Sequence, residues 1–405
     1  MMRKVSFILS FFLSISYSIV NSQTIQQIGY YNDNGIVSMS SETNFVILGN
    51  GSVIDISNPS SPNLFGSVSL PGFNTSVLAS GNYSYFGSGM TEILTIADIS
   101  NPGFPLKIGS RIFSSTAGGI FGISKSSNIL CLANGGDGVY TMDVSNPANP
   151  IVLDSVAISS GQARDIVTHG SFAYVAHTDG LKVINISNPA NINIISTIGS
   201  GYFSIDIDTI HNLVFLGKGS GGIDVFNIAN PYLPIPAFAI PNSCDTAWDV
   251  KYRNNLVYLA TNNCGLFIYK IIGSLGVQMA NFSNQINGQS FAVSLQDSLI
   301  LLAGLINGVA ILKYDSLGVA GIVDEKDFNQ ITISPNPATN YVEFNVKSAS
   351  ISEIEIINSI GESVFKENCT NTKNRIDISN LTRGNYIISF KNKKRSWSKK
   401  LIKSE

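Results

Sequence analysis

The sequence predicts an all-β chain, a seven-bladed β-propeller followed by a small C-terminal β-sandwich with an immunoglobulin-like fold. The first observation is a phrase, Asp-Ile-Ser-Asn-Pro or a close variant, that ends at five prolines spaced 42 to 45 residues apart. The second is that each interval holds short β-runs separated by turn residues, as a propeller blade of ~40–45 residues requires. The third is a tail of about 75 residues in short alternating runs. The five prolines are Pro59, Pro102, Pro147, Pro189 and Pro231.

The fourth unit shows the expected blade most clearly. Its strands are predicted over residues 165–169, 172–176, 181–186 and 192–198. Gly170-Ser171 and Asp179-Gly180 supply the first two turns, and Asn188-Pro189 ends the third strand. Proline has no N–H for a ladder, and the asparagine before it can bond its own backbone in an Asx turn. Four antiparallel strands joined in this way make one blade.

Seven such units can be counted along the chain. The last two have lost the Asn-Pro phrase but keep their strands and the glycine before strand three, Gly265 and Gly308. The seventh unit lacks a fourth strand, because residue 315 onward is loop-like. A β-run over residues 24–30 precedes the first unit and has no partner of its own. We therefore expect this run to supply the outer strand of the seventh blade, which closes the ring and removes an open sheet edge.

The two ends of the chain indicate export. Arg3 and Lys4 precede an apolar run over residues 5–20, which is typical of a signal peptide cleaved after Ser22. The alternative, a transmembrane anchor, is disfavoured because the run is short for a span. Residues 1–22 are thus assigned as signal peptide, 23–316 as propeller, 317–330 as linker and 331–405 as tail domain. The net charge of −2 does not favour nucleic-acid binding, and we expect a monomer.

The repeat unit resembles LVIVD-type repeats, which occur in bacterial surface propellers. The resemblance covers about residues 24–316 and is carried by the five Asn-Pro phrases at even spacing. It implies the propeller fold. It implies no particular reaction, because proteins with these repeats share none.

The tail resembles the C-terminal sorting domain of the type IX secretion system of Bacteroidetes. The matching pieces are Ser334-Pro335-Asn336-Pro337-Ala338, residues 377–381, residues 384–386 and residues 400–403. The resemblance implies that the secretion machinery is a partner and that the protein is secreted or attached to the cell surface. Seven Lys or Arg residues in the last fifteen suit a solvated surface that this machinery reads better than a nucleic-acid patch.

Three aspartates are the main candidates for a ligand site. When the first strands are aligned by their distance to the second strands, Asp165, Asp206 and Asp249 fall in register in blades four, five and six. First strands line the central channel, so we expect the three carboxylates near one mouth. They could hold Ca²⁺ through hard oxygen ligands, or a cationic or sugar ligand. The alternative is that each accepts N–H groups of its own or the next blade.

Arg164 and Trp248 precede two of these aspartates. A guanidinium and an indole at a channel mouth would suit a carbohydrate or peptide, and blade-to-blade packing is the alternative. The histidines, His169, His177 and His211, lie in different turns and lack zinc spacing. No other cofactor is indicated.

Cys244 and Cys264 form a candidate disulfide. Folding blade six about its Asn254-Asn255 turn leaves the two cysteines one position out of register, beyond the ends of the paired strands. A Cα separation below ~7 Å is then plausible, and the bond would stabilise the fold by ~3 kcal/mol on the loop-entropy model.

These observations favour a secreted or surface-displayed scaffold for binding or adhesion, with an extracellular polymer or protein as ligand. The alternative is an extracellular polysaccharide hydrolase or lyase with its site at the channel mouth. The sequence contains no GxSxG or HExxH motif and no catalytic residue is assigned. Acid pairs from different blades keep the enzyme alternative open.

Overall fold

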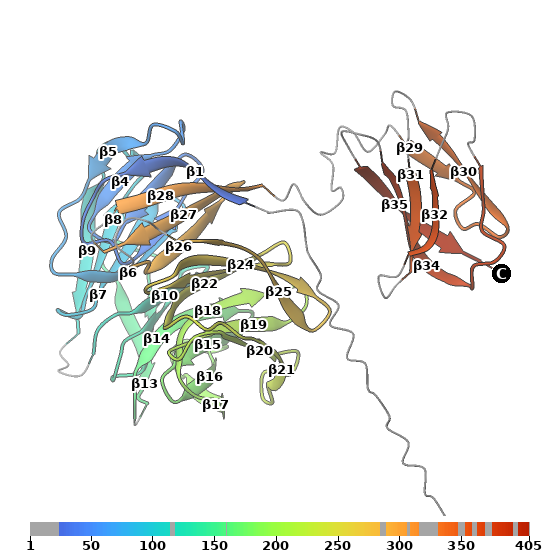
Figure 1. Ribbon diagram of the computed structural model, residues 1–405. Helices are drawn as coiled ribbons and strands as arrows, with labels where there is room; N and C mark the ends of the chain where they lie inside the picture. Colours follow the sequence, from blue (N-terminus) through green and yellow to red (C-terminus); the bar gives the residue numbers. More distant parts are fainter. Residues whose placement is uncertain are drawn as a thin grey trace, which may run out of the picture. The chain divides into compact units, whose positions relative to one another are not determined.

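The computed structural model describes residues 24–113, 118–158, 160–283, 289–305, 308–315, 331–346, 353–358, 363–368, 375–391 and 396–404. The predicted signal peptide and the predicted linker lie outside these residues. The described residues fall into two units, residues 24–315 and the tail from Ile331 onward (Figure 1). All regular elements in them are β-strands. No helix long and apolar enough to span a membrane occurs in the described part of the chain.

Seven four-stranded antiparallel sheets make up the first unit as described. Blades one to three are β2 (Met39–Ser41), β3 (Phe45–Leu48), β4 (Ser52–Asp55), β5 (Asn63–Ser67); β6 (Asn74–Ser80), β7 (Tyr83–Ser88), β8 (Ile93–Asp98), β9 (Leu106–Ile112); and β10 (Gly122–Ser126), β11 (Ile129–Ala133), β12 (Val139–Asp143), β13 (Ile151–Val156). Blades four and five are β14 (Ala163–His169), β15 (Phe172–His177), β16 (Gly180–Asn185), β17 (Asn193–Ile198); and β18 (Tyr202–Asp208), β19 (Leu213–Lys218), β20 (Ile223–Asn227), β21 (Ile235–Ile240). Blades six and seven are β22 (Ala247–Arg253), β23 (Leu256–Thr261), β24 (Gly265–Ile272), β25 (Leu275–Phe282); and β26 (Ala292–Gln296), β27 (Leu299–Gly304), β28 (Gly308–Asp315), β1 (Thr24–Tyr31).

The sheets are arranged in a closed ring (Figure 1), and a cavity lies at its centre. The first strand of each blade contacts the first strand of the next, and β26 of the last blade contacts β2 of the first. The apolar cores lie between adjacent blades: Ile47 and Val53 of blade one share a cluster with Phe86 and Ala97 of blade two. Burial of apolar side chains between blades therefore holds the ring together.

The N-terminal strand closes the ring, as the sequence predicts. β1 pairs antiparallel with β28 from Thr24 opposite Asp315 to Tyr31 opposite Val309, and it becomes the outer strand of blade seven. Residues from the start and end of the propeller therefore share one sheet. This removes the free edge that β28 would otherwise present.

The Asn-Pro phrase folds as two consecutive Asx turns. In blade two Asp98 Oδ1 accepts the backbone N–H of Ser100 at 2.8 Å, and Asn101 Oδ1 accepts that of Gly103 at 3.3 Å. The N–H of Phe104 then donates to the carbonyl oxygen of Asn101, which closes a tight turn. The same bonds recur in the third, fourth and fifth copies. The third strand ends at the first residue of the phrase, Asp98 in blade two, three residues before the expected Asn-Pro position. The asparagine then turns the chain by bonding to its own backbone, as expected.

The phrase also contacts the preceding blade, which the sequence analysis did not foresee. The Pro147 carbonyl of blade three lies so close to Gly109 in β9 that a Cβ there would overlap it. Gly66 of blade one meets the Pro102 carbonyl in the same way, and Gly29 of β1 meets that of Pro59. A glycine on these outer strands is required because the backbones approach this closely.

The tail forms two sheets with seven strands among the described residues, in agreement with the short alternating runs that predict a β-sandwich there. The sheets are β29 (Ile331–Ser334), β30 (Tyr341–Val346), β33 (Arg375–Asp377), and β32 (Ser363–Asn368), β31 (Glu353–Ile357), β34 (Gly384–Lys391), β35 (Ser396–Lys403). Val342 and Phe344 of one sheet share a buried core with Ile356 and Ile388 of the other, so the sheets pack face to face. Asn336 Oδ1 accepts the N–H of Ile402, which ties the start of this domain to its last strand.

Candidate functional site

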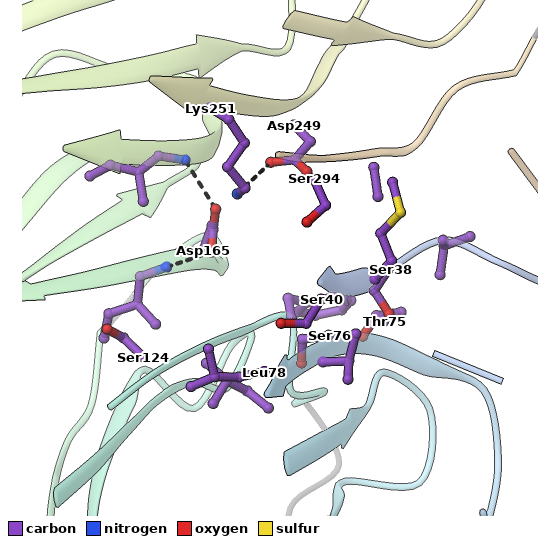
Figure 2. A pocket seen from close by; sticks show the side chains of 18 of the residues that line it. Ser38, Ser40, Thr75, Ser76, Leu78, Ser124, Asp165, Asp249, Lys251 and Ser294 are labelled. Carbon is purple, nitrogen blue, oxygen red and sulfur yellow. Dashed lines mark hydrogen bonds and ion pairs between the residues drawn. The ribbon is translucent and has the colours of Figure 1, made fainter. Parts of the chain in front are cut away.

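A cavity of about 420 Å³ occupies the centre of the ring and is lined by the first strands of all seven blades (Figure 2). One arc, from β14 to β22, carries charged side chains: Asp165, Asp249 and Lys251. The opposite arc, on β2 and β6, carries small hydroxyl side chains, among them Ser40 and Ser76. The cavity is therefore chemically two-sided.

Each of the three predicted aspartates reaches across to the next blade. Asp165 Oδ2 accepts the N–H of Ile205 at 3.1 Å, and its Oδ1 accepts the N–H of Ile166 at 2.8 Å. Asp206 Oδ2 accepts the N–H of Tyr252 at 2.7 Å. The first strand of a blade has a ladder partner on one side only, so these N–H groups would otherwise be unpaired.

Asp249 follows the same rule, because its Oδ2 accepts the N–H of Val293 at 2.9 Å. Ser40 Oγ on β2 accepts the N–H of Ala79, and Ser124 Oγ on β10 accepts that of Thr168, both at 3.0 Å. Polar side chains facing the channel thus join neighbouring blades. This is the structural role that the sequence analysis gave as the alternative for the aspartates.

Lys251 lies among the three carboxylates, and the sequence analysis missed it. Its Nζ is 3.0 Å from Asp249 Oδ1, and the two side chains are 35% and 15% exposed. Burial disfavours the charged ammonium, but attraction to Asp249, Asp206 and Asp165 outweighs it and raises the pKa of Lys251. The available signal was period-two alternation, which places residues 249 and 251 on one face of a strand.

Burial changes the acidity of two of the aspartates. It raises the pKa of Asp165 to about 7, against the opposing effect of Lys251 and the two backbone N–H groups. It also raises the pKa of Asp206, again opposed by Lys251. Both groups lie deep in the ring yet keep some exposed surface, because the channel beside them is hollow. A pKa near 7 means that both protonation states of Asp165 are populated near neutral pH.

The predicted register of Asp206 is wrong by two residues. Asp165 pairs with Ala176 and Asp249 with Ala260, each the fifth residue of the second strand. In blade five the equivalent position holds Ser204, which pairs with Gly217. Asp206 therefore lies one step deeper along the channel, level with Lys251.

Turn length explains the error. The first and second strands of blades four and six are joined by two-residue turns, Gly170-Ser171 and Asn254-Asn255. In blade five Asp208 pairs with Leu213, so the turn spans residues 209–212. An alignment that counts residues back from the second strand assumes turns of equal length. The two extra turn residues of blade five therefore put every residue of β18 two positions out in that alignment. An even shift keeps Asp206 on the channel face.

Aromatic rings and one guanidinium form a continuous series at the start of the first strands. The Arg164 guanidinium carbon lies 4.8 Å from the ring centroid of Phe121 and 5.0 Å from that of Phe203. The Trp248 and Phe203 centroids are 5.7 Å apart, and those of Trp248 and Phe291 are 5.2 Å apart. We call these five residues, which come from blades three to seven, the mouth girdle. All five line the cavity.

Arg164 and Trp248 of the mouth girdle were predicted from the sequence, whereas Phe121, Phe203 and Phe291 were not. Arg164, Phe203 and Trp248 each sit at a β-bulge, where one extra residue interrupts the pairing with the second strand. Aligning the residue before each channel-facing position across the repeats would have revealed the series.

Two N–H groups of the mouth girdle have no hydrogen-bond partner among the described residues. They are Arg164 Nε and Trp248 Nε1, and both atoms are buried. Arg164 also has no ion-pair partner in the described ranges, and burial lowers the pKa of its guanidinium. Buried donors without acceptors are costly, so packing between blades alone does not explain why a guanidinium and an indole occur here.

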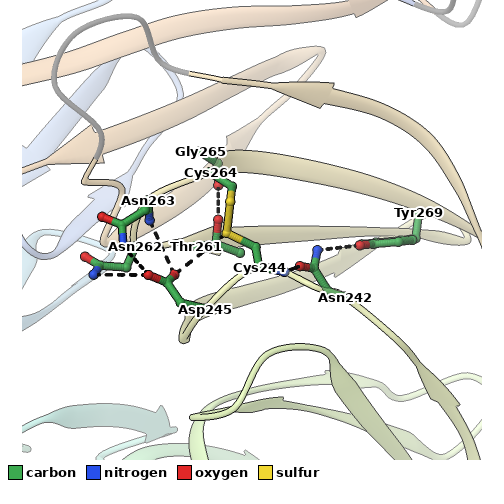
Figure 3. The surroundings of a disulfide bond; sticks show 9 residues. All are labelled: Asn242, Cys244, Asp245, Thr261, Asn262, Asn263, Cys264, Gly265 and Tyr269. Atoms are coloured by element: carbon green, nitrogen blue, oxygen red, sulfur yellow. Dashed lines mark hydrogen bonds between the residues drawn. A yellow bond between two sulfur atoms is a disulfide. The ribbon is translucent and has the colours of Figure 1, made fainter.

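A disulfide joins Cys244 and Cys264 beside the mouth girdle, with Cα atoms 6.3 Å apart (Figure 3). The bulge at Trp248 removes the one-residue offset expected from the sequence, because it shifts the pairing of the two strands by one position. Asn262 N–H accordingly donates to the Thr246 carbonyl oxygen at 3.3 Å, in line with the cysteine pair.

Side chains around the disulfide fix the two loops that it connects. Asn242 Oδ1 accepts the N–H of Cys244 at 2.7 Å, and its Nδ2 donates to Tyr269 Oη at 2.6 Å. Asp245 accepts hydrogen bonds from Asn262 and Asn263 across the bond (Figure 3). These bonds hold the loop before β22 against the turn before β24. The backbone that leads into Trp248 is therefore fixed.

No group of three His, Cys, Asp or Glu side chains in the described ranges could hold a metal ion. The Ca²⁺ site suggested by the three aspartates stays a prediction, and the ammonium of Lys251 now lies where a cation would bind. His177 is buried with its Nδ1 accepting the Asp179 N–H, and burial lowers its pKa to about 4. His211 pairs with Asp208 in the long turn of blade five.

Comparisons with known proteins agree with this architecture. LVIVD repeats match residues 49–69, 71–110, 119–157 and 160–198. The secretion system C-terminal sorting domain matches residues 332–404. Such a domain marks proteins that the type IX system exports to the cell surface or secretes, and it implies interaction with that machinery. No curated protein matches the chain in sequence.

Two solved structures share the fold at low identity. A chain in the "Crystal Structure of Mitotic Checkpoint Complex" is 12% identical with a TM-score of 0.58, and the match covers 78% of this chain and 99% of that one. The computationally designed Ika8 protein is 13% identical with a TM-score of 0.52, covering 71% and 98%. These likenesses concern the fold alone.

Proposed function

We propose that this LVIVD-repeat propeller, exported by its type IX sorting domain to the cell surface or beyond, is a scaffold that binds an extracellular ligand at the channel mouth. The observation that carries the proposal is the mouth girdle, with Arg164 Nε and Trp248 Nε1 buried and unpartnered in the described structure. Packing between blades needs apolar side chains. It does not need a guanidinium and an indole whose donors go unused.

The dimensions of the cavity support a small ligand group. Its volume of about 420 Å³ lies within the ~300–1,000 Å³ range of ligand pockets. That space suits one residue of a polymer whose remainder lies outside the ring. Aromatic faces with a few directed donors are the usual composition of such sites.

A second candidate function is an extracellular polysaccharide hydrolase or lyase. The observation that favours it is Asp165, whose carboxyl has its pKa raised by burial to about 7 and could act as a general acid. However, both oxygens of Asp165 already accept backbone N–H groups. The carboxylates serve to join the blades, so we place binding before catalysis.

The test is a glycan and peptide array probed with the protein from Gln23 to Glu405. We expect a defined set of glycans or peptides to bind, and Trp248→Leu to abolish their binding. Leu106→Ala, on the exposed outer strand β9, is the matched control and should bind as the parent does. A blank array, or binding that persists in Trp248→Leu, would contradict the proposal. Turnover of pooled polysaccharides that is lost in Asp165→Asn would favour the enzyme instead.

A further inference from the structure

The charge of Arg164 has no counter-charge in the described structure, although three carboxylates lie in the same channel. In the nearest of these in sequence, Asp165, each carboxylate oxygen accepts a hydrogen bond from a backbone N–H group. Asp249 pairs with Lys251 and with the N–H of Val293. The carboxylates of the channel therefore bond to Lys251 and to backbone N–H groups of the blades. The guanidinium at the mouth has no carboxylate partner among the described residues.

The aromatic contacts hold this guanidinium in place without neutralising it. Phe121 and Phe203 lie 4.8 and 5.0 Å from its central carbon, so ring faces stabilise the cation and fix the plane of the group. Arg164 as a whole is only partly buried, and its terminal nitrogens, which are not among the buried unpartnered atoms, are the part left for a ligand. A planar guanidinium offers a carboxylate two parallel hydrogen bonds.

The other residues that line the cavity indicate which class of molecule would carry the carboxylate that binds Arg164. Lys125 also lines it and has no ion pair among the described residues. On the far arc Ser40 Oγ accepts a backbone N–H, which leaves its O–H free to donate. Trp248 adds an aromatic ring to the lining. Hydroxyls, rings and positive charges without an ion pair in the described structure together match a sugar that bears a carboxylate.

We propose that the channel mouth binds uronic acid residues of an extracellular polysaccharide, with the carboxylate on Arg164 and the sugar ring against Phe203 and Trp248. This inference rests on the proposed binding function and names the class of its ligand. A neutral sugar would leave the guanidinium without a counter-charge. An acidic peptide would supply the carboxylate but not the hydroxyl groups, and it is an outcome of the test below.

The experiment measures the binding of defined oligomers to the protein from Gln23 to Glu405 by titration calorimetry. The probes are tetramers of galacturonate, mannuronate and guluronate, the methyl ester of the first, and tetraglutamate. We expect at least one uronate tetramer to bind. The affinity of tetragalacturonate or another uronate should exceed that of the neutral ester by tenfold or more. The advantage should shrink as salt concentration rises.

Arg164→Met separates charge from packing, because methionine still fills the space between Phe121 and Phe203. In this variant the uronate should bind no better than the ester, while circular dichroism and thermal unfolding report an intact fold. Lys107→Met, on the exposed face of β9, removes the same charge elsewhere and should leave binding unchanged.

The outcomes separate the two proposals. Failure of all three uronates, or equal binding by Arg164→Met and the parent, overturns the uronate inference. If neutral glycans or tetraglutamate bind instead with dependence on Trp248, the binding function stands and only the ligand class is wrong. If the array and every probe are negative, both proposals fail.

Discussion

Replacing Lys251 with methionine tests whether the charge cluster in the channel is assembled as described. The Nζ to Asp249 Oδ1 distance of 3.0 Å corresponds to roughly 5 kcal/mol of attraction at an effective dielectric constant of about 20. Lys251 is 35% exposed, so solvent screening and the desolvation cost reduce the net effect. We expect Lys251→Met to lower the free energy of unfolding by about 2–3 kcal/mol at pH 8.

The loss should depend on pH with a defined sign. The folded-state pKa of Asp165 is about 7 and that of Asp206 is also raised, so the folded protein binds extra protons between about pH 4 and 7. Stability therefore falls as pH rises through this window. Lys251 lowers both values, so its removal steepens the fall. At pH 5, where Asp165 is largely protonated, we expect a smaller loss than at pH 8.

Urea unfolding at low salt, at pH 5 and pH 8, measures both quantities. Lys125→Met is the matched control, because Lys125 lines the same cavity without an ion pair among the described residues. It should change stability by less than about 0.5 kcal/mol at either pH. An equal loss at the two pH values, or an equal loss in the control, would refute the reasoning.

Three further predictions concern the fold. Replacing Cys244 and Cys264 with serine should lower the free energy of unfolding by about 3 kcal/mol and the melting temperature by about 5 °C; calorimetry that shows no change, or no effect of reductant on the parent, would contradict this. Deleting residues 24–31 exposes the edge of β28 and should cause association visible by light scattering, whereas a stable monomer would count against closure by β1. Gly109→Ala should cost about 2 kcal/mol by forcing apart two backbones, while Gly103→Ala, which meets only ordinary contacts, should cost under about 0.5 kcal/mol in urea unfolding.

Local turn chemistry made the fold predictable from the sequence. Each Asn-Pro pair forms its turn with its own neighbours, so its position fixes the end of a third strand without knowledge of the rest of the ring. The closing strand was predictable for a different reason: residues 24–30 formed a β-run with no partner, and one blade lacked a strand. Both inferences need only counting and the rules of strand pairing.

The candidate site was less predictable, because its geometry depends on small irregularities. The turn over residues 209–212 displaced Asp206 by two positions. The bulge at Trp248 moved the cysteine pair by one position and brought Cys244 into line with Cys264. Neither an extra turn residue nor a bulge changes the composition of a strand, so period-two patterns do not reveal them. Lys251 was overlooked although its spacing from Asp249 placed it on the same face.

The contact between the Asn-Pro turn and the preceding blade explains why two blades can do without the phrase. In blade six a two-residue turn joins β24 and β25, both eight residues long. Gly276 at the start of β25 packs so closely against Ile240 of blade five that a Cβ would overlap that side chain. The extended hairpin thus makes the contact that a turn makes elsewhere. In blade seven the third strand ends the propeller at Asp315 and the outer strand is β1, so no connecting turn exists there. The phrase is therefore retained where the connection between the third and outer strands must itself reach the neighbouring blade.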